Sequence, residues 1–494
     1  MAMGSRRGWW RGPRARWGLL AATVALAAGV WFWPSRGLQK PAFQPPSASG
    51  SSQSPAAKRL RAGAAGANVI IILTDAAAAR HFTSFGHQRD TTPNMGRFHE
   101  QSVLFTEAYS TAASTKPSVT SLFTGEFPDT HGTLSVVSRF TPDAATLSEC
   151  LGKAGYTTAA ITASPSVAAS FGFSRGFDHF HEVFRDAGLE AAGHEPRATG
   201  GQVVDGALVL KSAVEWLKAH KDERLFAYLH FREPHAPYVA PDPFMARFAS
   251  NTGRRGSEPF YDASLAYVDS LVGKLLREME TAGLLDKSVV ILMADHGEAF
   301  GEHGRSGHGA TPYTEMAHIP LAFHLPARSQ AAARRRSELF STADVMPTLL
   351  DLLQIPPPPT MQGRSRLALL AGEDETTPAF AVTRALGEDL TGGKRDFGQV
   401  SYALRVPRYT LILAKQGKQV ELYDRNADPA EQRNIARDRP DLVKQLQAQF
   451  AAWADTQRGR PVVLPGGRLY AVGGKESDMD DTTRRQLKSL GYLK

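Results

Sequence analysis

Continuous apolar runs that end in acidic residues dominate the pattern of hydrophobic and polar positions along the chain. One run, 68–74, ends at Asp75, and another, 289–294, ends at Asp295 and His296. An apolar run without alternation is typical of a strand buried on both faces, as in a parallel sheet. Because ligands bind beyond the carboxyl ends of such strands, we expect Asp75, Asp295 and His296 to meet at one sheet edge and to hold a metal ion.

Segments of helical periodicity alternate with further apolar runs. We predict helices over 147–156, 203–220, 261–284 and 341–353, and strands over 103–106, 157–162, 225–231 and 320–324. This alternation indicates the α/β class, a sandwich of helices around a mostly parallel central sheet.

A hydroxyl-rich loop, 108–118, leads into a predicted helix with Pro117 in its first turn, where proline is tolerated. Thr115 lies at the start of that helix, beside backbone N–H groups that favour an anionic group. It is also placed early enough to reach a metal held by Asp75. The alternative is that Thr115 only caps the helix.

Two other polar clusters follow predicted strands. His235 lies between prolines directly after the run 225–231, and a glycine-rich loop after His296 carries Glu298, His303 and His308. A histidine at the carboxyl end of a strand is a candidate for substrate contact or proton transfer.

Charge and cysteine content exclude two classes of protein. The formal net charge is +8, but residues 1–66 contain ten Lys and Arg and no Asp or Glu, so residues 67–494 carry −2. A nearly neutral body does not support nucleic-acid binding. The one cysteine, Cys150, excludes an intrachain disulfide and a cysteine-based zinc cluster.

The N-terminal region predicts export. Five arginines precede an apolar stretch from Trp17 to Trp33, so residues 1–34 are predicted to be an inner-membrane anchor or a cleaved signal segment. The body would then lie outside the cytoplasm, anchored or free in the periplasm. Residues 35–66 are rich in Pro, Ser, Ala and Gly, which predicts a disordered linker.

Several short motifs, in order, give the chain a family resemblance. They are 68–75, Thr92-Pro93-Asn94, Lys116-Pro117-Ser118, Pro234-His235-Ala236-Pro237 and Asp295-His296-Gly297-Glu298. On these the chain resembles the sulfatases of the alkaline phosphatase superfamily. The resemblance implies a catalytic domain over 67–370 and a smaller α+β subdomain over 371–494.

The chain departs from the sulfatase pattern at several positions. Thr115 stands where sulfatases place a Cys or Ser that becomes formylglycine, and Thr cannot form that aldehyde. Val119 replaces the motif's arginine, Ala76 replaces a second aspartate, and His308 replaces a lysine. Much of the cationic clamp for sulfate is therefore missing.

The remaining residues are similar to the metal site of the phosphoethanolamine and glycerophosphate transferases. By that analogy Asp75, Thr115, Asp295 and His296 hold one divalent metal ion. The imidazole ligand favours zinc or manganese, while calcium is possible by family. Thr115, His235 and His308 are the candidate catalytic residues, and Lys116, His235, His303 and His308 are the candidate substrate-binding residues.

These observations lead to one main hypothesis and two alternatives. The main hypothesis is a metal-dependent hydrolase of sulfate or phosphate esters that forms a covalent intermediate on Thr115. The substrate would be a small-molecule, glycan or lipid head-group ester. The alternatives are an envelope phospho-group transferase of the phosphoethanolamine type and a non-catalytic binding protein on the same fold.

Overall fold

The two apolar runs lie at the centre of a nine-stranded sheet in the computed structural model, which describes residues 53–140, 144–186, 206–249, 257–375, 380–389, 396–414, 417–457 and 480–489. β1 (Asn68–Thr74) pairs in parallel with β6 (Ser288–Ala294) on one side and with β5 (Leu225–Phe231) on the other. Every residue of these three strands is buried, as expected for strands covered on both faces.

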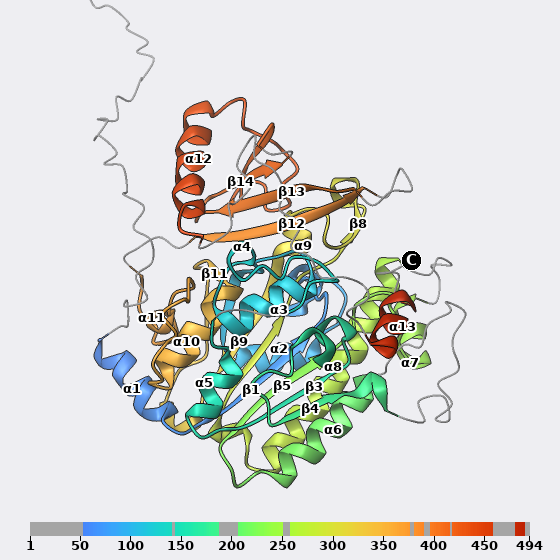
Figure 1. The fold of residues 1–494 in the computed structure, drawn as a ribbon, viewed down its shortest axis with the longest axis vertical. Helices are drawn as coiled ribbons and strands as arrows, with labels where there is room; N and C mark the ends of the chain where they lie inside the picture. Colours follow the sequence, from blue (N-terminus) through green and yellow to red (C-terminus); the bar gives the residue numbers. More distant parts are fainter. Residues whose placement is uncertain are drawn as a thin grey trace, which may run out of the picture. The chain divides into compact units, whose positions relative to one another are not determined.

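The sheet has the order β10-β2-β9-β6-β1-β5-β3-β4, and β11 also pairs with β2 (Figure 1). Among the described strands β9 runs antiparallel to its neighbours β2 and β6, and the remaining pairings are parallel. The α/β class with a mostly parallel sheet is confirmed. The outer strands are β2 (Val103–Tyr109), β3 (Thr157–Thr162), β4 (His179–Glu182), β9 (His318–His324), β10 (Arg334–Arg336) and β11 (Phe340–Ser341).

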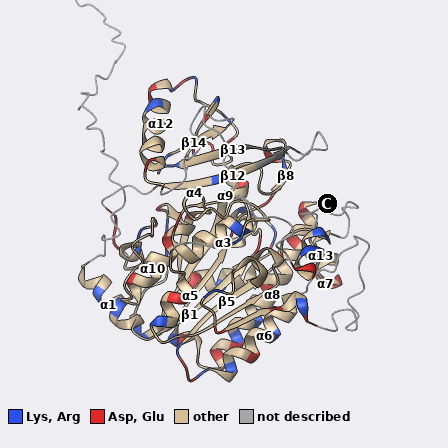
Figure 2. Cartoon of the chain, viewed as in Figure 1, with Lys and Arg blue, Asp and Glu red and all other residues tan. Residues whose placement is uncertain are grey.

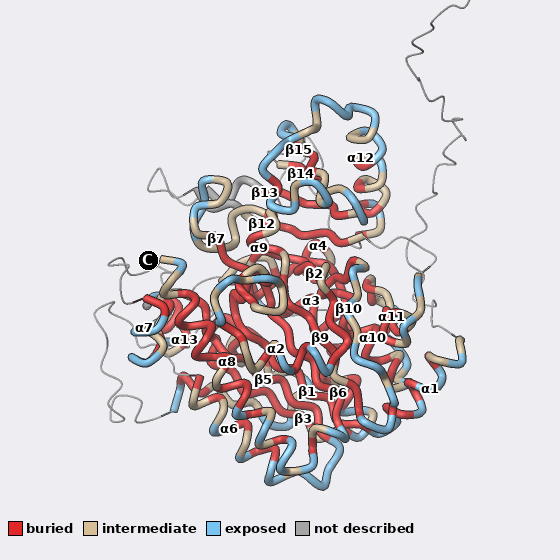
Figure 3. Tube along the Cα trace, turned by 180° about the vertical axis from the view of Figure 1, so that it is seen from behind, coloured by how far each residue is buried: buried red, intermediate tan, exposed pale blue. Residues whose placement is uncertain are grey.

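Two groups of helices cover the sheet. One group is α2 (Pro93–Glu100), α6 (Gly206–Ala219) and α8 (Glu258–Thr281), and the other includes α3 (Thr115–Thr124), α5 (Leu147–Lys153) and α10 (Val345–Leu352). Members of each group contact one another, and β3 is contacted by α5 from one group and by α6 from the other. In Figure 3 the buried part of the trace runs through the sheet, and the exposed part lies at the ends of the strands and along the outer helices.

A second sheet is antiparallel and has the order β12-β13-β14-β15. Its strands are β12 (Ala381–Asp389), β13 (Asp396–Arg405), β14 (Tyr409–Ala414) and β15 (Gln419–Asp424), and α12 (Pro440–Ala454) packs on it through Phe450 and Trp453. A parallel bridge between Ala112 and Arg384 joins β12 to the loop that precedes α3. The small C-terminal subdomain is thereby in contact with the segment that carries Thr115.

The predicted linker over 35–66 is wrong at its C-terminal end. Residues Pro55–Ala64 form helix α1, which Ser54 caps by accepting a hydrogen bond from the Ala57 N–H. Leu60 is buried in the main core, and the Arg61 guanidinium lies 2.8 Å from the Asp351 carboxylate of α10. The segment is rich in the helix-forming residues Ala, Lys, Arg and Leu, and the contact with Asp351 adds tertiary support that a short helix needs.

The predicted membrane or signal segment, 1–34, lies outside the described residues. Within the described part, the helices include none with the length and apolar character needed to cross a bilayer. Lys and Arg positions are interspersed with Asp and Glu positions over the helices of that part (Figure 2), in keeping with its nearly neutral formal charge.

Short elements complete the described chain. The helices are α4 (Pro128–His131), α7 (Asp242–Ala249), α9 (Thr314–Ala317), α11 (Leu367–Leu370) and α13 (Asp481–Ser489), and the hairpin of β7 (Ala299–Phe300) and β8 (Ser306–Gly307) lies in the glycine-rich loop.

Candidate active site

The carboxyl ends of β1 and β6 bring together the acidic residues that follow them. Thr74 is in register with Ala294, so Asp75 and Asp295 leave the sheet side by side. Both residues are 1 % exposed, and His296 is fully buried. The sequence-based expectation that these three residues meet at one sheet edge agrees with this geometry.

Thr115 is the first residue of α3 and faces the two strand ends. Its Oγ1 lies 3.3 Å from Asp75 Oδ1 and 3.2 Å from His296 Nε2. The side chain is almost completely buried. All four residues that were expected to hold a metal, Asp75, Thr115, Asp295 and His296, therefore form one cluster.

His230 is a member of this cluster that sequence reasoning missed. It lies within β5, in register with Leu73 and Thr162, and its Nε2 is 3.2 Å from Asp75 Oδ2. The Tyr228 hydroxyl contacts the other ring nitrogen, Nδ1, at 3.0 Å. A histidine inside an otherwise apolar strand was the available signal, because its polar ring needs a partner when it is buried.

The protein fixes the orientation of His296 through its backbone. His296 Nδ1 lies 2.8 Å from the Gly297 carbonyl, which can only accept, so Nδ1 carries the proton and Nε2 carries a lone pair. That lone pair points toward Asp75 Oδ1 and Asp295 Oδ2, each 3.6 Å away. This tautomer is the one that metal-ligating histidines adopt.

Asp295 supplies a second indication of a cation. Its Oδ1 accepts hydrogen bonds from the Ala76 and His296 N–H groups, whereas its Oδ2 is buried and has no hydrogen-bond partner among the described residues. Asp75, His230 and Asp295 each offer a ligand atom within 4.8 Å of the others. Buried lone pairs that converge in this way fit a divalent metal ion with nitrogen and oxygen ligands.

The charges of the two aspartates are strongly interdependent. Burial would raise the pKa of Asp75, but His235, His230 and His296 outweigh burial and lower it. Burial and the neighbouring Asp75 charge raise the pKa of Asp295. Two carboxylates so close together resist simultaneous ionisation unless a cation lies between them.

Two more imidazoles line the site. The His308 ring lies 4.4 Å from the His296 ring and 4.8 Å from the His235 ring, measured between centroids. His308 Nδ1 is 3.0 Å from the buried Glu298 carboxylate, and His235 Nδ1 is 2.8 Å from the Ala236 carbonyl. The expected placement of His235 and His308 beside the metal-ligand residues agrees with these contacts.

The two histidines differ in their electrostatic environment. Burial and the neighbouring Arg232 charge lower the pKa of His235 well below its usual value. Burial also disfavours the charged form of His308, but the Glu298 carboxylate outweighs it and raises the pKa of His308. His308 therefore holds a proton more readily than His235 does.

Lys116 is not brought to this cluster. Its ammonium is buried, donates to the carbonyls of Val136 and Ser138 and lies 3.0 Å from the centroid of the Phe171 ring. Burial lowers the pKa of Lys116 well below its usual value. The described contacts of its ammonium are with these carbonyls and this ring, and they do not include a residue of the Thr115 cluster.

His303 is also turned away from the cluster. Its ring stacks on Tyr313 at 3.7 Å, Nδ1 lies 2.9 Å from Glu315 Oε1, and Nε2 lies 2.7 Å from the Glu431 carbonyl. Both ring nitrogens are therefore used to join the glycine-rich loop to neighbouring segments.

The positions where a sulfatase would carry charge are apolar here. Val119 is fully buried in the core on α3. Ala76 adopts a left-handed backbone conformation with φ of 59° and directs its N–H to Asp295. At these two positions, the cluster has neither the motif's arginine nor a further carboxylate.

Comparisons with known proteins identify the family of the chain. Residues 67–355 match the family model described as "Sulfatase", and residues 301–456 match "N-sulphoglucosamine sulphohydrolase, C-terminal". An N-acetylgalactosamine-6-O-sulfatase of Bacteroides thetaiotaomicron is 24% identical over an alignment 480 residues long that covers 77% of this chain and 91% of that protein. An endo-4-O-sulfatase of the same organism is 25% identical over 427 residues, covering 73% of this chain and 84% of that protein.

Solved structures share the fold. The phosphonate monoester hydrolase of Agrobacterium radiobacter superposes with a TM-score of 0.66 at 20% identity and covers 78% of this chain and 96% of that one. The matched model spans more than half of the chain and includes every residue of the Thr115 cluster. The chain belongs to the sulfatase family, within the alkaline phosphatase superfamily.

Proposed function

We propose that the protein is a metal-dependent ester hydrolase that forms a covalent intermediate on the hydroxyl oxygen of Thr115. The observation that carries this proposal is the position of Thr115 Oγ1, 3.3 Å from Asp75 Oδ1 and 3.2 Å from His296 Nε2, at the N-terminus of α3. A hydroxyl between two proton acceptors and beside free helix N–H groups is placed to react with an anionic ester.

The residues that would hold the metal are Asp75, Asp295, His296 and Thr115, with His230 beside Asp75. When bound, a divalent ion lowers the pKa of a coordinated hydroxyl and polarises the ester oxygens. The nitrogen ligands favour zinc or manganese over calcium.

The reaction proceeds in two displacements. Thr115 Oγ1 loses its proton to Asp75 Oδ1, which accepts its hydrogen bond, and attacks the sulfur or phosphorus atom; the bond to the alcohol oxygen breaks, and the alcohol leaves with a proton from His308. Water then loses a proton to His308 and attacks the same atom. The bond to Thr115 Oγ1 breaks, the inorganic anion is released, and Oγ1 takes its proton back from Asp75. Glu298 holds the His308 ring through Nδ1, and His235, whose ring centroid lies 4.8 Å from that of His308, is placed to contact the same substrate.

The relatives suggest a sulfate ester of a sugar as the substrate. The name N-acetylgalactosamine-6-O-sulfatase describes a protein that covers most of this chain, and further matches include sulfatases. The N-terminal segment 1–34 supports export of the catalytic body, either anchored in the inner membrane or released to the periplasm, where extracellular glycan fragments are available.

A phosphorus ester is the second candidate substrate. Thr115 cannot become the aldehyde that the sulfatase resemblance implies, and Val119 leaves the sulfate clamp without its arginine. A phosphonate monoester hydrolase shares the fold. A threonine nucleophile beside one metal is also the arrangement that the transferase resemblance implies.

The test uses the purified full chain. Bound metal is measured by mass spectrometry, and turnover of an aryl sulfate, an aryl phosphate and an aryl phosphodiester is compared in wild type, Thr115→Ala and Thr115→Ser. We expect Thr115→Ala to lose about 10⁴-fold or more in kcat on the preferred ester and Thr115→Ser to retain part of it. Thr120→Ala is the matched control, because within the described part of the chain its buried hydroxyl bonds only the Lys116 carbonyl of the same helix.

Each other outcome contradicts part of the proposal. Turnover that survives in Thr115→Ala would show that another group is the nucleophile. Transfer of the phospho group to a second alcohol, in preference to water, would favour the transferase alternative. A folded protein without metal and without turnover would favour the non-catalytic alternative.

A further inference from the structure

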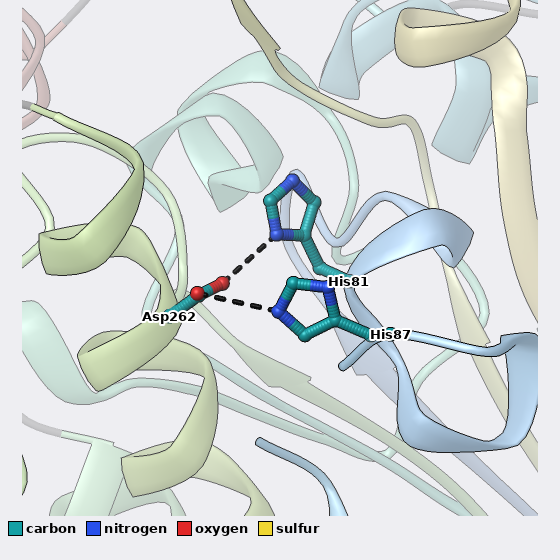
Figure 4. Close-up of side chains that lie close together, drawn as sticks. All are labelled: His81, His87 and Asp262. Atoms are coloured by element: carbon teal, nitrogen blue, oxygen red, sulfur yellow. Dashed lines mark hydrogen bonds and ion pairs between the residues drawn. The ribbon is translucent and has the colours of Figure 1, made fainter. Parts of the chain in front are cut away.

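A second group of metal-ligating side chains lies beside the loop that follows β1. His81 ends the 3-10 helix Ala79–His81, His87 follows the turn at Gly86, and Asp262 lies near the N-terminus of α8 (Figure 4). Each of the three offers one ligand atom within 4.8 Å of the others. None of them contributes to the Thr115 cluster, so the group needs an explanation of its own.

The two imidazoles face the same carboxylate. His81 Nδ1 lies 2.9 Å from Asp262 Oδ1, and His87 Nε2 lies 3.3 Å from Asp262 Oδ2. Figure 4 shows a ring nitrogen of each histidine turned toward Asp262. Neighbouring ligand atoms of a tetrahedral zinc ion are about 3.3 Å apart, given Zn–N and Zn–O lengths near 2.0 Å. The spacing of the group is thus close to that of a ligand shell.

The second ring nitrogen of His81 is the decisive atom. His81 is 1 % exposed, and its Nε2 is buried without a hydrogen-bond partner among the described residues. The nearest acidic group is Glu258, one turn before Asp262 on α8, with Oε1 3.6 Å from Nε2. His81 therefore lies between two carboxylates, one at each ring nitrogen.

A neutral imidazole cannot satisfy both carboxylates. It has one N–H, so whichever nitrogen carries the proton, the other turns a lone pair toward carboxylate oxygen. A doubly protonated ring would satisfy both, but it would bury a second cation at the Asp262 carboxylate, which Arg89 already contacts. A cation at Nδ1 removes the conflict, because Nε2 can then carry the proton and donate it to Glu258.

Arg89 partly compensates the charge of Asp262. Its Nη1 lies 2.7 Å from Asp262 Oδ2, and its guanidinium packs on the Phe248 ring. This contact explains how the carboxylate is tolerated, but Arg89 does not reach His81 Nε2 in the described contacts. An ion-pair network centred on Arg89 is therefore the competing explanation, and it predicts no bound metal.

We propose that His81, His87 and Asp262 bind a divalent transition metal of the zinc class, with Glu258 accepting the remaining N–H of His81. Two imidazoles and one carboxylate suit zinc better than calcium or magnesium, which prefer oxygen ligands. A carboxylate on the far nitrogen is the usual partner of a metal-bound histidine. The ion would join the loop after Asp75 to α8 and would be structural rather than catalytic.

The experiment counts zinc ions on the full chain after removal of metal with a chelator and titration with zinc. We expect His87→Gln to bind one ion fewer than wild type and to keep its ester turnover. Gln88→Ala is the matched control, since Gln88 is the exposed neighbour of His87 and bonds only the Gly86 carbonyl among its described contacts. Glu258→Gln should bind the same number of ions, one of them about 10–100-fold more weakly.

A second measurement separates this site from the Thr115 cluster. Asp75→Asn removes a ligand of that cluster, and its cobalt form should still show the visible absorption of a tetrahedral ion. Adding His87→Gln should abolish that absorption. If His87→Gln binds as many zinc ions as wild type with unchanged affinity, or if cobalt-loaded Asp75→Asn shows no tetrahedral absorption, the proposal is overturned and the Arg89 ion-pair network is the correct account.

Discussion

Tyr228→Phe removes one oxygen atom from beneath the candidate metal site. The Tyr228 hydroxyl lies 3.0 Å from His230 Nδ1, and both residues are fully buried in β5. The ring itself stays, packed edge-on against Phe123, so the substitution changes one hydrogen bond and leaves no cavity larger than the lost oxygen. Its effect can therefore be assigned to the lost contact with His230.

The magnitude follows from the burial of His230. Leaving a buried polar atom without its partner costs about 1–3 kcal/mol in the free energy of unfolding. If His230 supports the metal site through the contact of its Nε2 with Asp75, then losing the hydrogen bond at Nδ1 should weaken metal affinity by about 10–100-fold. The two effects are measured separately, by denaturant unfolding of the metal-free protein and by competition with a chelator of known affinity.

Tyr156→Phe is the matched control. The Tyr156 hydroxyl is also buried and donates to the Ala67 carbonyl at 2.9 Å, but it lies at the amino ends of β1 and β3. It should lower the free energy of unfolding by about 0.5–1.5 kcal/mol and leave metal affinity unchanged. If Tyr228→Phe weakens metal binding no more than Tyr156→Phe, His230 has no role at the metal and the assignment is wrong.

Three further predictions concern stability. Arg61→Ala should cost about 3 kcal/mol in unfolding free energy, because it leaves the partly buried Asp351 carboxylate without its guanidinium; equal unfolding curves would show that this contact contributes nothing. Thr146→Ala should lower the free energy of unfolding by about 1 kcal/mol, because it removes the capping box at the start of α5. Unchanged helix content in the variant would contradict this. Burial lowers the pKa of His99 to about 3 from 6.5, so the unfolded chain takes up the proton first as pH falls. The free energy of unfolding should then drop by about 2 kcal/mol between pH 6.5 and 5. The difference in this free energy between wild type and His99→Phe should change by the same amount over that range. If the two proteins lose stability in parallel as the pH falls, the prediction is refuted.

The parts of the fold that depend on local pattern could be predicted from the sequence. The run before Asp75 and the run before Asp295 read as buried strands because positions 69–73 and 289–294 are all apolar, and parallel pairing then places the two aspartates at one edge. Thr115 could be placed at the start of a helix from Pro117 alone. These predictions need only the periodicity of the chain and the rule that the carboxyl ends of neighbouring parallel strands lie at the same edge of the sheet.

The sequence did not determine the direction in which each candidate side chain points, and this limited the assignment of the site residues. Lys116 and Thr115 are neighbours in sequence, but successive residues of a helix point about 100° apart, and Lys116 turns to the carbonyls of Val136 and Ser138. Likewise, the glycine-rich loop brings His308 to the site and carries His303 to Tyr313. A loop rich in glycine has too many backbone conformations for sequence to choose between these outcomes.

The sequence by itself determined the class of the fold, the two acidic strand ends and the hydroxyl between them, because periodicity and burial are local properties of the chain. Only the tertiary structure decided that His230 joins Asp75, that α1 is held by Asp351, and that His81 lies between two carboxylates. Each of these contacts joins residues more than 150 positions apart. Long-range contacts are set by strand register and by the packing of helices on the sheet, and neither leaves a signal in the local pattern of residues.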